Sequence, residues 1–479
     1  MLGRTRRIHF VGIGGIGMSG IAELLANLDY EVSGSDAKRS DVTDRLEKLG
    51  ARVFIGHQAD NVGTADVVVV SSAIRRDNPE VAEAMRRRIP VIPRAEMLAE
   101  LMRLRYGIAV AGAHGKTTST SMIALVLERA GLDPTAVIGG RLSAFGSNAR
   151  LGRGEFMVVE ADESDRSFLK LSPAIAVITN LDREHMESYG TWENLQQAFV
   201  DFANEVPFYG AVVACVDDEP VRTIVPRITR RVIGYGFAQQ DGISGARIIG
   251  SGLVLEAFAS RATVTLRGVS GDEERLGELR LNVPGRHNML NALAAVAVAH
   301  ELGVPFARIA SALGEFRGAE RRFQLRGEER GVMVVDDYGH HPTEIAAVIA
   351  AARAGIDRRV IVVFQPHRYT RTEQLMPEFA NALRAADRIV LTDIYPAGEP
   401  PIAGVTIEAL ADAVRAVAPD RVAVVKGIDE LPERVASMVR SGDLVITLGA
   451  GSITTVADRI LAALRSGQPA PPAGRQTWA

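Results

Sequence analysis

Short apolar runs alternate with amphipathic segments along most of the chain, and this pattern predicts alternating strands and helices. The runs are rich in valine, isoleucine and alanine and too short for buried helices, which is typical of strands covered on both faces in a parallel sheet. We predict strands at Ile8–Val11, Glu31–Ser33, Val67–Val70, Gly107–Ala111, Phe156–Val159, Ala174–Ile178, Val332–Val335, Val360–Phe364, Arg388–Leu391, Val422–Val425 and Leu444–Leu448. Helical spacing predicts helices that include Met18–Asn27, Lys116–Gly131 and Asn288–Leu302.

The same pattern divides the 479 residues into three consecutive α/β segments. A chain of this length exceeds what one hydrophobic core usually supports. We place the domains at residues 1–106, 107–318 and 319–479. Between about Arg247 and Val283 the pattern changes to short alternating stretches, such as Ala262–Leu266, which favour an antiparallel patch added to the parallel sheet of the central domain.

Composition narrows the classes of protein. A formal net charge of −3 gives no reason to expect a nucleic-acid partner, and the single cysteine, Cys215, excludes an intramolecular disulfide and a cysteine-based metal site. No apolar run approaches the roughly 18–20 residues of a membrane span. The strand at Ile8–Val11 is too short for the apolar region of a signal peptide. We therefore expect a cytoplasmic protein without membrane insertion.

A glycine-rich turn joins the strand Gly107–Ala111 to the helix that begins near Lys116. The turn reads Gly112, Ala113, His114, Gly115, Lys116, Thr117, Thr118. Such a turn lets backbone N–H groups face an anion, and the helix N-terminus adds partial positive charge. Lys116 then reaches the outer phosphates of a nucleotide, and the Thr117 hydroxyl holds Mg²⁺. The loop is shorter than the usual phosphate loop, because Val110 stands where the first glycine would be, yet strand, turn, Lys-Thr and helix together indicate ATP binding.

A second glycine-rich turn, residues 12–17, follows the first strand and contains Gly14, Gly15 and Gly17. Asp36 lies at the end of the next strand, about where a dinucleotide-binding fingerprint has its ribose-binding acid. Ser71 and Ser72 follow the valine strand, where their hydroxyls add contacts to the same ligand. A turn of this kind binds a diphosphate but does not distinguish NAD from a nucleotide sugar. A nicotinamide- or flavin-dependent oxidoreductase therefore stays open at this point.

Acidic and histidine residues follow the next two strands of the central segment. Glu160 ends one strand and opens an acidic run to Asp165, and His185 follows the other strand. The carboxyl ends of parallel strands are where α/β sheets bind ligands. Mg²⁺ prefers oxygen ligands, so Glu160 fits one ion, whereas His185 suits a second, phosphate-bridging ion. Asn288 opens a helix, where its amide either caps the helix or contacts the nucleotide.

Two loops of the last segment concentrate polar side chains. Asp336, Asp337, Tyr338, Gly339, His340, His341 and Pro342 follow one strand, and Gln365, Pro366, His367, Arg368, Tyr369, Thr370 and Arg371 follow the next. Arginine forks bind carboxylates with two parallel hydrogen bonds. The second loop therefore favours an anionic group such as the carboxylate of an amino acid.

In this order the motifs resemble the Mur ligase family, ATP-dependent enzymes that form amide bonds in peptidoglycan synthesis. The resemblance covers nearly the whole chain, with further matching segments at Gly285–Asn291, Arg321–Gln324 and Thr392–Gly398. It implies a Rossmann-like UDP-sugar-binding domain (1–106), a central P-loop ATPase-like α/β domain (107–318) and a Rossmann-like amino-acid-binding domain (319–479). The branch it implies joins L-alanine to the lactyl carboxylate of UDP-N-acetylmuramate. The alternative is a ligase that attaches a recycled murein tripeptide to the same UDP-sugar.

The resemblance also implies roles residue by residue. The catalytic residues would be Lys116, Glu160, His185 and Arg368; ATP would contact Gly112, Ala113, His114, Gly115, Lys116, Thr117, Thr118, Asn288, Arg322 and Asp337; the UDP-sugar would contact Gly14, Gly15, Gly17, Asp36, Ser71 and Ser72; the amino acid would contact Tyr338, His367, Arg368 and Arg371; and Mg²⁺ would contact Thr117, Glu160 and His185. Several family members hold a second metal with a carbamylated lysine. This chain has no lysine between residues 171 and 425, which excludes one just downstream of His185. The oligomeric state stays open.

Overall fold

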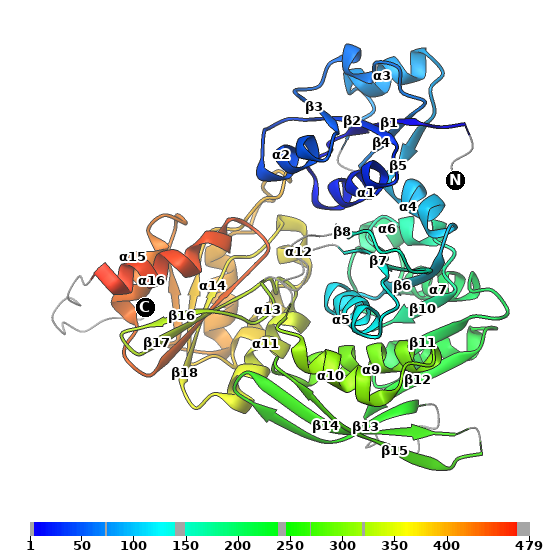
Figure 1. Ribbon diagram of the computed structural model, residues 1–479. Coiled ribbons are helices and arrows are strands. Elements are labelled where there is room, and N and C mark those ends of the chain that lie inside the picture. Colours follow the sequence, from blue (N-terminus) through cyan, green and yellow to red (C-terminus); the bar gives the residue numbers. More distant parts are fainter. Residues whose placement is uncertain are drawn as a thin grey trace. The chain divides into compact units, whose positions relative to one another are not determined.

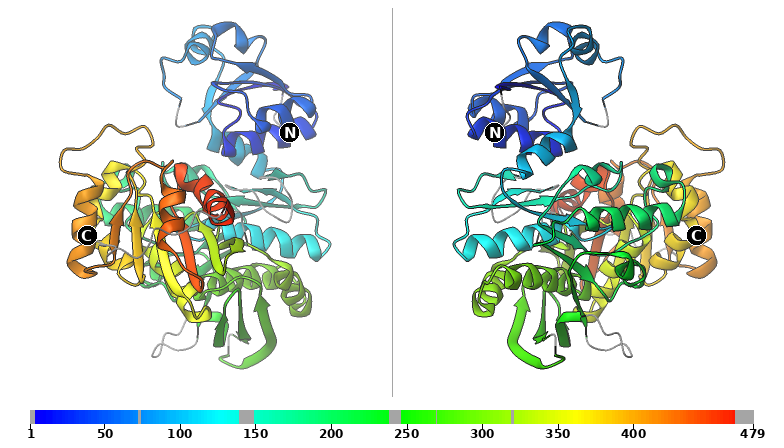
Figure 2. Two further views of the ribbon diagram at one scale, coloured as in Figure 1. Left: turned by 90° about the vertical axis from the view of Figure 1, so that its left-hand side faces the viewer. Right: turned by 90° about the vertical axis from the view of Figure 1, so that its right-hand side faces the viewer.

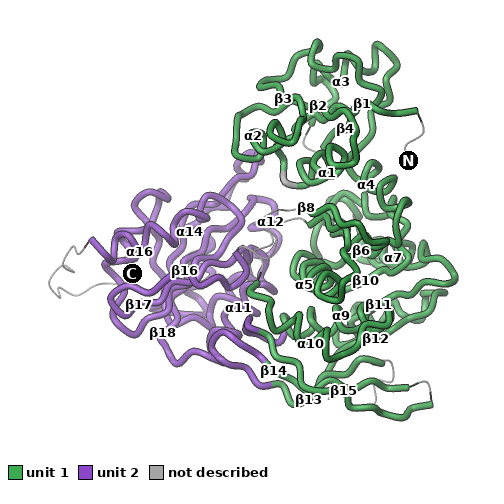
Figure 3. The backbone as a smooth tube through the Cα atoms, viewed as in Figure 1, with its two compact units in different colours: residues 1–253, 261–281, 288–319 green, residues 254–260, 282–287, 320–479 purple. Residues whose placement is uncertain are grey.

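The computed structural model describes residues 4–71, 74–138, 149–237, 246–268, 270–318 and 321–466. The chain folds into two compact units (Figure 3). Unit 1 comprises Met1–Leu253, Arg261–Leu281 and Asn288–Ala319, and unit 2 comprises Val254–Ser260, Asn282–His287 and Glu320–Ala479. The predicted contact of Ser72 lies outside the described residues.

The first sheet of unit 1 has five parallel strands in the order β3-β2-β1-β4-β5 (Figure 1). Its strands are β1 (Arg7–Val11), β2 (Glu31–Asp36), β3 (Arg52–Ile55), β4 (Val67–Val70) and β5 (Val91–Pro93), and its helices are α1 (Ile16–Asn27), α2 (Asp41–Lys48), α3 (Pro79–Arg86) and α4 (Arg94–Met102). The strand order reverses between β1 and β4. The turn after β1 and Ser71 after β4 therefore share the edge at which doubly wound sheets bind ligands.

The second sheet of unit 1 has ten strands in the order β15-β14-β13-β12-β11-β10-β6-β9-β7-β8. Its strands are β6 (Tyr106–Ala111), β7 (Thr135–Val137), β8 (Ala149–Arg150), β9 (Phe156–Glu160), β10 (Ile175–Ile178), β11 (Ala211–Cys215), β12 (Val232–Phe237), β13 (Ala246–Glu256), β14 (Ala259–Arg267) and β15 (Glu273–Leu281). β6 lies between β9 and β10 and is parallel to both, so the segments that follow all three strands meet at one edge. Only Ala257 and Phe258 join β13 to β14, and such a short connection reverses the chain direction, as predicted for the antiparallel patch.

Helices of the central sheet include α5 (Lys116–Arg129), α6 (Met186–Tyr189), α7 (Trp192–Asn204), α8 (Glu219–Ile224), α9 (Arg286–Glu301) and α10 (Phe306–Glu315). Helices α5 and α10 lie side by side, as both views show (Figures 1 and 2). Caps fix several helix starts; the Thr191 hydroxyl, for example, accepts the Asn194 N–H at the start of α7.

The sheet of unit 2 has six strands in the order β16-β17-β21-β18-β19-β20, with only β16 antiparallel to its neighbour. The strands are β16 (Gln324–Glu329), β17 (Val332–Asp337), β18 (Arg359–Phe364), β19 (Arg388–Leu391), β20 (Val422–Val424) and β21 (Asp443–Leu448), and the helices are α11 (Pro342–Gly355), α12 (Tyr369–Gln374), α13 (Met376–Leu383), α14 (Ile407–Val417), α15 (Leu431–Met438) and α16 (Val456–Ser466). Along β18, Val360 and Val362 belong to one hydrophobic cluster, and Ile361 and Val363 to another. The apolar run is therefore buried on both faces, as its composition predicted.

The predicted α/β architecture in three parts is confirmed by the three sheets. The domain boundaries at 106/107 and 318/319 stay predictions. Among the described residues, none of the helices combines the length and the apolar character that crossing a bilayer requires.

Candidate active site

The glycine-rich turn between β6 and α5 has a backbone that two glycines make possible. Gly112 and Gly115 have φ values of 136° and 80°, in the region that disfavours side chains. A Cβ on Gly112 would overlap the Thr179 hydroxyl, and one on Gly115 would lie 2.5 Å from Asn291 Oδ1. The segment after β10 and helix α9 therefore pack against the turn. At the start of α5 the turn exposes backbone groups rather than side chains.

Lys116, the first residue of α5, folds back over this turn. Its ammonium group donates to the carbonyls of Gly112 (2.6 Å) and Ala113 (3.0 Å) and forms an ion pair with Glu163 at 2.8 Å. Burial opposes the charge, but the carboxylates of Glu163 and Glu160 outweigh burial and raise the pKa of Lys116. Lys116 is therefore a permanently charged, nearly enclosed cation at a helix N-terminus.

Carboxylates gather beside this lysine. The Thr117 hydroxyl donates to Glu160 at the end of β9, at 3.0 Å from Oε2. Glu163, Glu184 and His185 bring ligand atoms within 4.8 Å of one another. Glu163 is buried, and its Oε2 has no hydrogen-bond partner among the described residues. Burial raises the pKa of Glu163 to about 7, although Lys116 pulls it down. This donor set of carboxylate, hydroxyl and imidazole groups fits a hard divalent cation.

The segment after β10 locks the phosphate loop in place. Asn180 Oδ1 accepts the His114 N–H at 2.8 Å, and the Thr179 hydroxyl donates to the His114 carbonyl at 2.7 Å. The His114 ring contacts Asp182 at 2.9 Å. These bonds fix the loop backbone before any ligand is present, which lowers the ordering cost of binding.

The first glycine loop is held differently. Gly12 has a φ of 83°, and Gly15 is the N-cap of α1. Asp36 accepts the N–H of Gly14 at 2.9 Å, so this carboxylate orders the loop. Ser71 lies against Gly12, as the switch point between β1 and β4 requires. Gly17 lies on the first turn of α1 against the guanidinium of Arg94, and a Cβ at this position would displace that flexible side chain.

A cavity of about 290 Å³ in unit 1 is lined by residues from both glycine-rich loops. Gly17 and Ile21 of α1 line one side, and Lys116 and Glu160 line another. Arg94, at the start of α4, lines it as well. A ligand in this cavity would reach from the first glycine loop to the phosphate loop.

In unit 2, the end of β17 carries a structural carboxylate and an exposed ring. Asp337 is buried, and its two oxygens accept the N–H groups of Phe323 (2.6 Å) and Gly339 (2.7 Å). Burial raises its pKa to about 6, although Arg322 pulls it down. Arg322 lies over the ring of Tyr338, 5.2 Å from its centroid, and contacts Glu344 at 3.3 Å.

The loop after β18 forms an aromatic and cationic cluster in unit 2. The ring of His367 stacks on Tyr395 with centroids 5.5 Å apart and meets the edge of His340 at 5.6 Å. Arg371 lies 3.4 Å from His367 Nδ1, and the buried Nε of Arg368 has no hydrogen-bond partner among the described residues. Burial, together with His340 and the two arginines, lowers the pKa of His367 to about 4. The cluster is thus a pair of cations beside a neutral imidazole, which suits a carboxylate next to an uncharged group.

Three family models match the chain in order. They are "Mur ligase family, catalytic domain" over residues 7–106, "Mur ligase middle domain" over residues 110–299 and "Mur ligase, glutamate ligase domain" over residues 321–451. The chain belongs to the Mur ligase family.

Individual Mur ligases are similar over nearly their whole length. A curated UDP-N-acetylmuramate–L-alanine ligase from Geobacter sp. is 54% identical over 467 residues, which are 97% of this chain and 99% of that protein. The solved UDP-N-acetylmuramate-alanine ligase of Thermotoga maritima has a TM-score of 0.79 at 32% identity and covers 96% of this chain and 99% of its own. A murein peptide ligase from Psychrobacter arcticus has a TM-score of 0.70 at 24% identity, covering 97% and 100%, and shows a likeness of fold.

The structure brings together many of the residues that sequence analysis singled out. Gly112–Thr118, Glu160 and His185 lie along one sheet edge of this Mur ligase. In unit 2, Tyr338 follows β17, whereas His367, Arg368 and, in α12, Arg371 follow β18. Their contacts with ATP, metal and amino acid stay predictions, as do those of Asn288, Arg322 and Asp337. The carboxylates of Asp36 and Asp337 already accept backbone N–H groups, so each also orders its own loop.

Sequence analysis assigned no site role to several residues that contact the predicted site. They are Arg94, Asp162, Glu163, Thr179, Asn180, Asn291 and Tyr395. Glu163 had a signal, because it belongs to the acidic run that opens at Glu160. Arg94 had none, because nothing in its local sequence indicates that it faces a loop after another strand.

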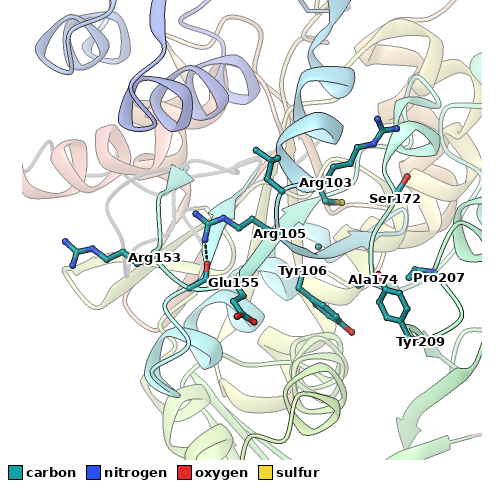
Figure 4. Close-up of a pocket in the computed structure, with 13 residues that line it drawn as sticks. Arg103, Arg105, Tyr106, Arg153, Glu155, Ser172, Ala174, Pro207 and Tyr209 are labelled. Carbon is teal, nitrogen blue, oxygen red and sulfur yellow. Dashed lines mark hydrogen bonds between the residues drawn. The ribbon is translucent and has the colours of Figure 1, made fainter. Parts of the chain in front are cut away.

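A second cavity of this Mur ligase, of about 660 Å³, lies at the opposite edge of the central sheet. Residues that precede β9 and β10, and the start of β6, line it (Figure 4). Arg103 and Arg153 point away from one another, and Arg105 donates to the carbonyl of Gly154. Because these charges do not converge, we do not assign the active site to this cavity.

Proposed function

We propose that this Mur ligase joins L-alanine to the lactyl carboxylate of UDP-N-acetylmuramate at the expense of ATP. The products are UDP-N-acetylmuramoyl-L-alanine, ADP and phosphate. The observation that carries the proposal is the cavity of about 290 Å³ that reaches from Gly17, beside the diphosphate-type loop, to Lys116 and Glu160. The relatives named as UDP-N-acetylmuramate–L-alanine ligases support this substrate pair.

In the first step, a carboxylate oxygen attacks the γ-phosphorus of ATP and ADP leaves, which gives an acyl phosphate. Two anions must meet in this step, so positive charge is needed where they approach. In our proposal Lys116 supplies it, since Lys116 lines the same cavity as Glu160. The phosphate oxygens would replace Glu163 and the two loop carbonyls as its partners.

In the second step, the amine of alanine attacks the acyl carbon, loses a proton and expels phosphate. In our proposal Arg368 and Arg371 bind the alanine carboxylate, and Tyr338 and His367 contact the rest of this small substrate. The low pKa of His367 keeps its imidazole neutral at physiological pH, so it does not repel a protonated amine. The identity of the base stays open between His340, His341 and a base from bulk solvent.

Mg²⁺ fits the donor set beside Lys116. Thr117 and Glu160 would hold one ion, and His185 would serve a second with Glu163 and Glu184 as neighbours. A bound Mg²⁺ would neutralise the phosphate oxygens of ATP. The buried Oε2 of Glu163 has no hydrogen-bond partner in the described part of the chain, which supports a cation in this cluster.

The tripeptide-adding alternative belongs to the same family. It is not favoured, because the curated alanine-adding relatives are 52–54% identical over 97% of this chain. Family membership also leaves the nicotinamide- or flavin-dependent oxidoreductase without support. The cytoplasmic location stays a prediction, and the oligomeric state stays open.

The test is phosphate release by the purified protein with ATP, Mg²⁺ and UDP-N-acetylmuramate. One arm adds L-alanine, one adds the murein tripeptide and one adds no acceptor. We expect release and the mass of the alanyl product in the alanine arm. Release in the tripeptide arm alone would move the assignment to the recycling branch, and no release in any arm would overturn the ligase.

A further inference from the structure

Arg94 is a cation in the cavity that the reaction as described does not use. It opens α4, and its guanidinium lies against Gly17 of α1, so a Cβ on Gly17 would displace it. The same side chain lines the cavity together with Lys116 and Glu160. Arg94 therefore stands between the first glycine loop and the phosphate loop, on a helix that belongs to neither.

Arg94 and Lys116 form ion pairs with two acidic residues that are adjacent in the sequence. Arg94 forms an ion pair with Asp162 at 3.2 Å, and the next residue, Glu163, pairs with Lys116 at 2.8 Å. Asp162 also accepts the N–H of Ser164 at 3.0 Å, which fixes its position. Two adjacent carboxylates thus hold the two cations that line the cavity.

The Arg94–Asp162 pair is open to exchange. The side chains are 32% and 43% exposed, and exposed ion pairs contribute only about 0–1 kcal/mol. A guanidinium binds phosphate or carboxylate oxygens through two parallel hydrogen bonds. An anionic substrate in the cavity therefore competes well with the single Asp162 contact.

We propose that Arg94 binds an anionic oxygen of the UDP-sugar, and that its ion pair with Asp162 opens when this substrate enters. The inference rests on the proposed function, which supplies the substrate. The UDP-sugar carries two anionic groups that fit, the diphosphate and the lactyl carboxylate. Binding of UDP, UDP-N-acetylglucosamine and UDP-N-acetylmuramate distinguishes them, because only the last carries the lactyl group.

The chain offers a matched control. Lys170 forms an ion pair with Glu96 of the same helix α4 at 2.9 Å, with exposures of 43% and 44%. This pair also joins α4 to the segment after β9, but Lys170 does not line the cavity. Lys170→Ala therefore removes a comparable contact of α4 and leaves the cavity intact.

The experiment is calorimetric titration of the full chain and four variants, with thermal unfolding as a check of folding. We expect Arg94→Ala to weaken UDP-N-acetylmuramate binding roughly 10- to 100-fold, since a hydrogen bond to a charged group is lost. Arg94→Lys should recover part of this loss, and Lys170→Ala should bind like the wild type. Asp162→Asn should bind as tightly as the wild type or more tightly, because it removes the competing carboxylate.

Steady-state kinetics distinguish substrate binding by Arg94 from a purely structural role, because a structural role would not change KM for the UDP-sugar alone. Arg94→Ala should raise KM for the UDP-sugar and leave KM for ATP near the wild-type value. Equal weakening of UDP binding would assign the contact to the diphosphate, and weakening of UDP-N-acetylmuramate alone would assign it to the carboxylate. Wild-type affinity in Arg94→Ala, or equal weakening in Asp162→Asn, would overturn the inference. Alanine ligation by the wild type would still stand in that case, so the two failures are distinguishable.

Discussion

The two glycine loops of unit 1 have the same position in their sheets but differ in the charged side chains that hold them. Each follows a central parallel strand and opens a helix, but the first loop carries no cation of its own and is ordered by Asp36. The second contains Lys116, which is enclosed by Glu160 and Glu163. The comparison teaches that the loop shape suffices to bind a diphosphate, whereas phosphoryl transfer also needs a held cation and acids for a metal.

Removing the held cation should have the largest effect. Lys116→Ala should lower kcat on the order of 10²–10³-fold, by analogy with the loss of one transition-state donor. Titration should show UDP-N-acetylmuramate binding close to that of the wild type, because the first loop keeps its own contacts. A large loss of UDP-sugar affinity would contradict the assignment of UDP-sugar binding to the first loop and phosphoryl transfer to the second.

The segments after β17 and β18 of unit 2 extend the comparison to a site that has two arginines, Arg368 and Arg371, in place of a lysine. Arg371→Ala should raise KM for L-alanine roughly 10- to 100-fold, since it removes a charge-assisted bond to the carboxylate. KM for ATP should not change. Arg415→Ala, which removes an exposed pair with Asp412 on α14, is the control. An unchanged KM for alanine in Arg371→Ala would remove this residue from the amino-acid site.

Individual glycines of unit 1 should differ in their tolerance of a side chain. Gly115→Ala should destabilise the protein by on the order of 2–3 kcal/mol, because a φ of 80° and the contact with Asn291 both oppose a Cβ. Gly131→Ala measures the cost of the positive φ alone, about 1 kcal/mol, because the φ of Gly131 is 81° and no other atom lies within 4 Å of an added Cβ. Gly15→Ala should be nearly neutral, since its φ is −61°. Urea unfolding measures all three, and equal losses would contradict the account.

The smallest effect concerns pH and the neutral imidazole of unit 2. The pKa of His367 falls to about 4 in the folded state, against about 6.5 in an unfolded chain. The unfolded state therefore binds more protons between these values, and stability is lost as pH falls from about 6.5 to 4. His367→Gln should flatten this part of the stability curve by roughly 1–2 kcal/mol, measured by urea unfolding at several pH values. An unchanged slope would show that His367 titrates normally.

The sequence predicted the fold well where the preference of a residue type for one local structure has a single physical cause. Valine runs such as Val67–Val70 identified buried strands, and Gly112 with Lys116 identified the turn at the start of α5. These signals are local, because strand burial and turn geometry depend on neighbouring residues.

The remaining site residues depend on contacts that local sequence does not encode. Which carboxylate of the run after β9 pairs with Lys116 depends on the backbone path, and that path selects Glu163. Arg94 reaches the cavity from a helix that precedes β6, and Tyr395 stacks on His367 from the loop after another strand. Such pairs form only when separate elements pack together.

The central claim is that the phosphate loop activates a carboxylate held in the cavity. The most direct test uses UDP-N-acetylmuramate with ¹⁸O in its lactyl carboxylate, together with ATP and L-alanine. The attacking carboxylate oxygen becomes the bridging oxygen of the acyl phosphate and leaves with phosphate. The account predicts one ¹⁸O atom in the released inorganic phosphate, measured by mass spectrometry. Phosphate without ¹⁸O, at an unchanged rate of alanyl product formation, would contradict it.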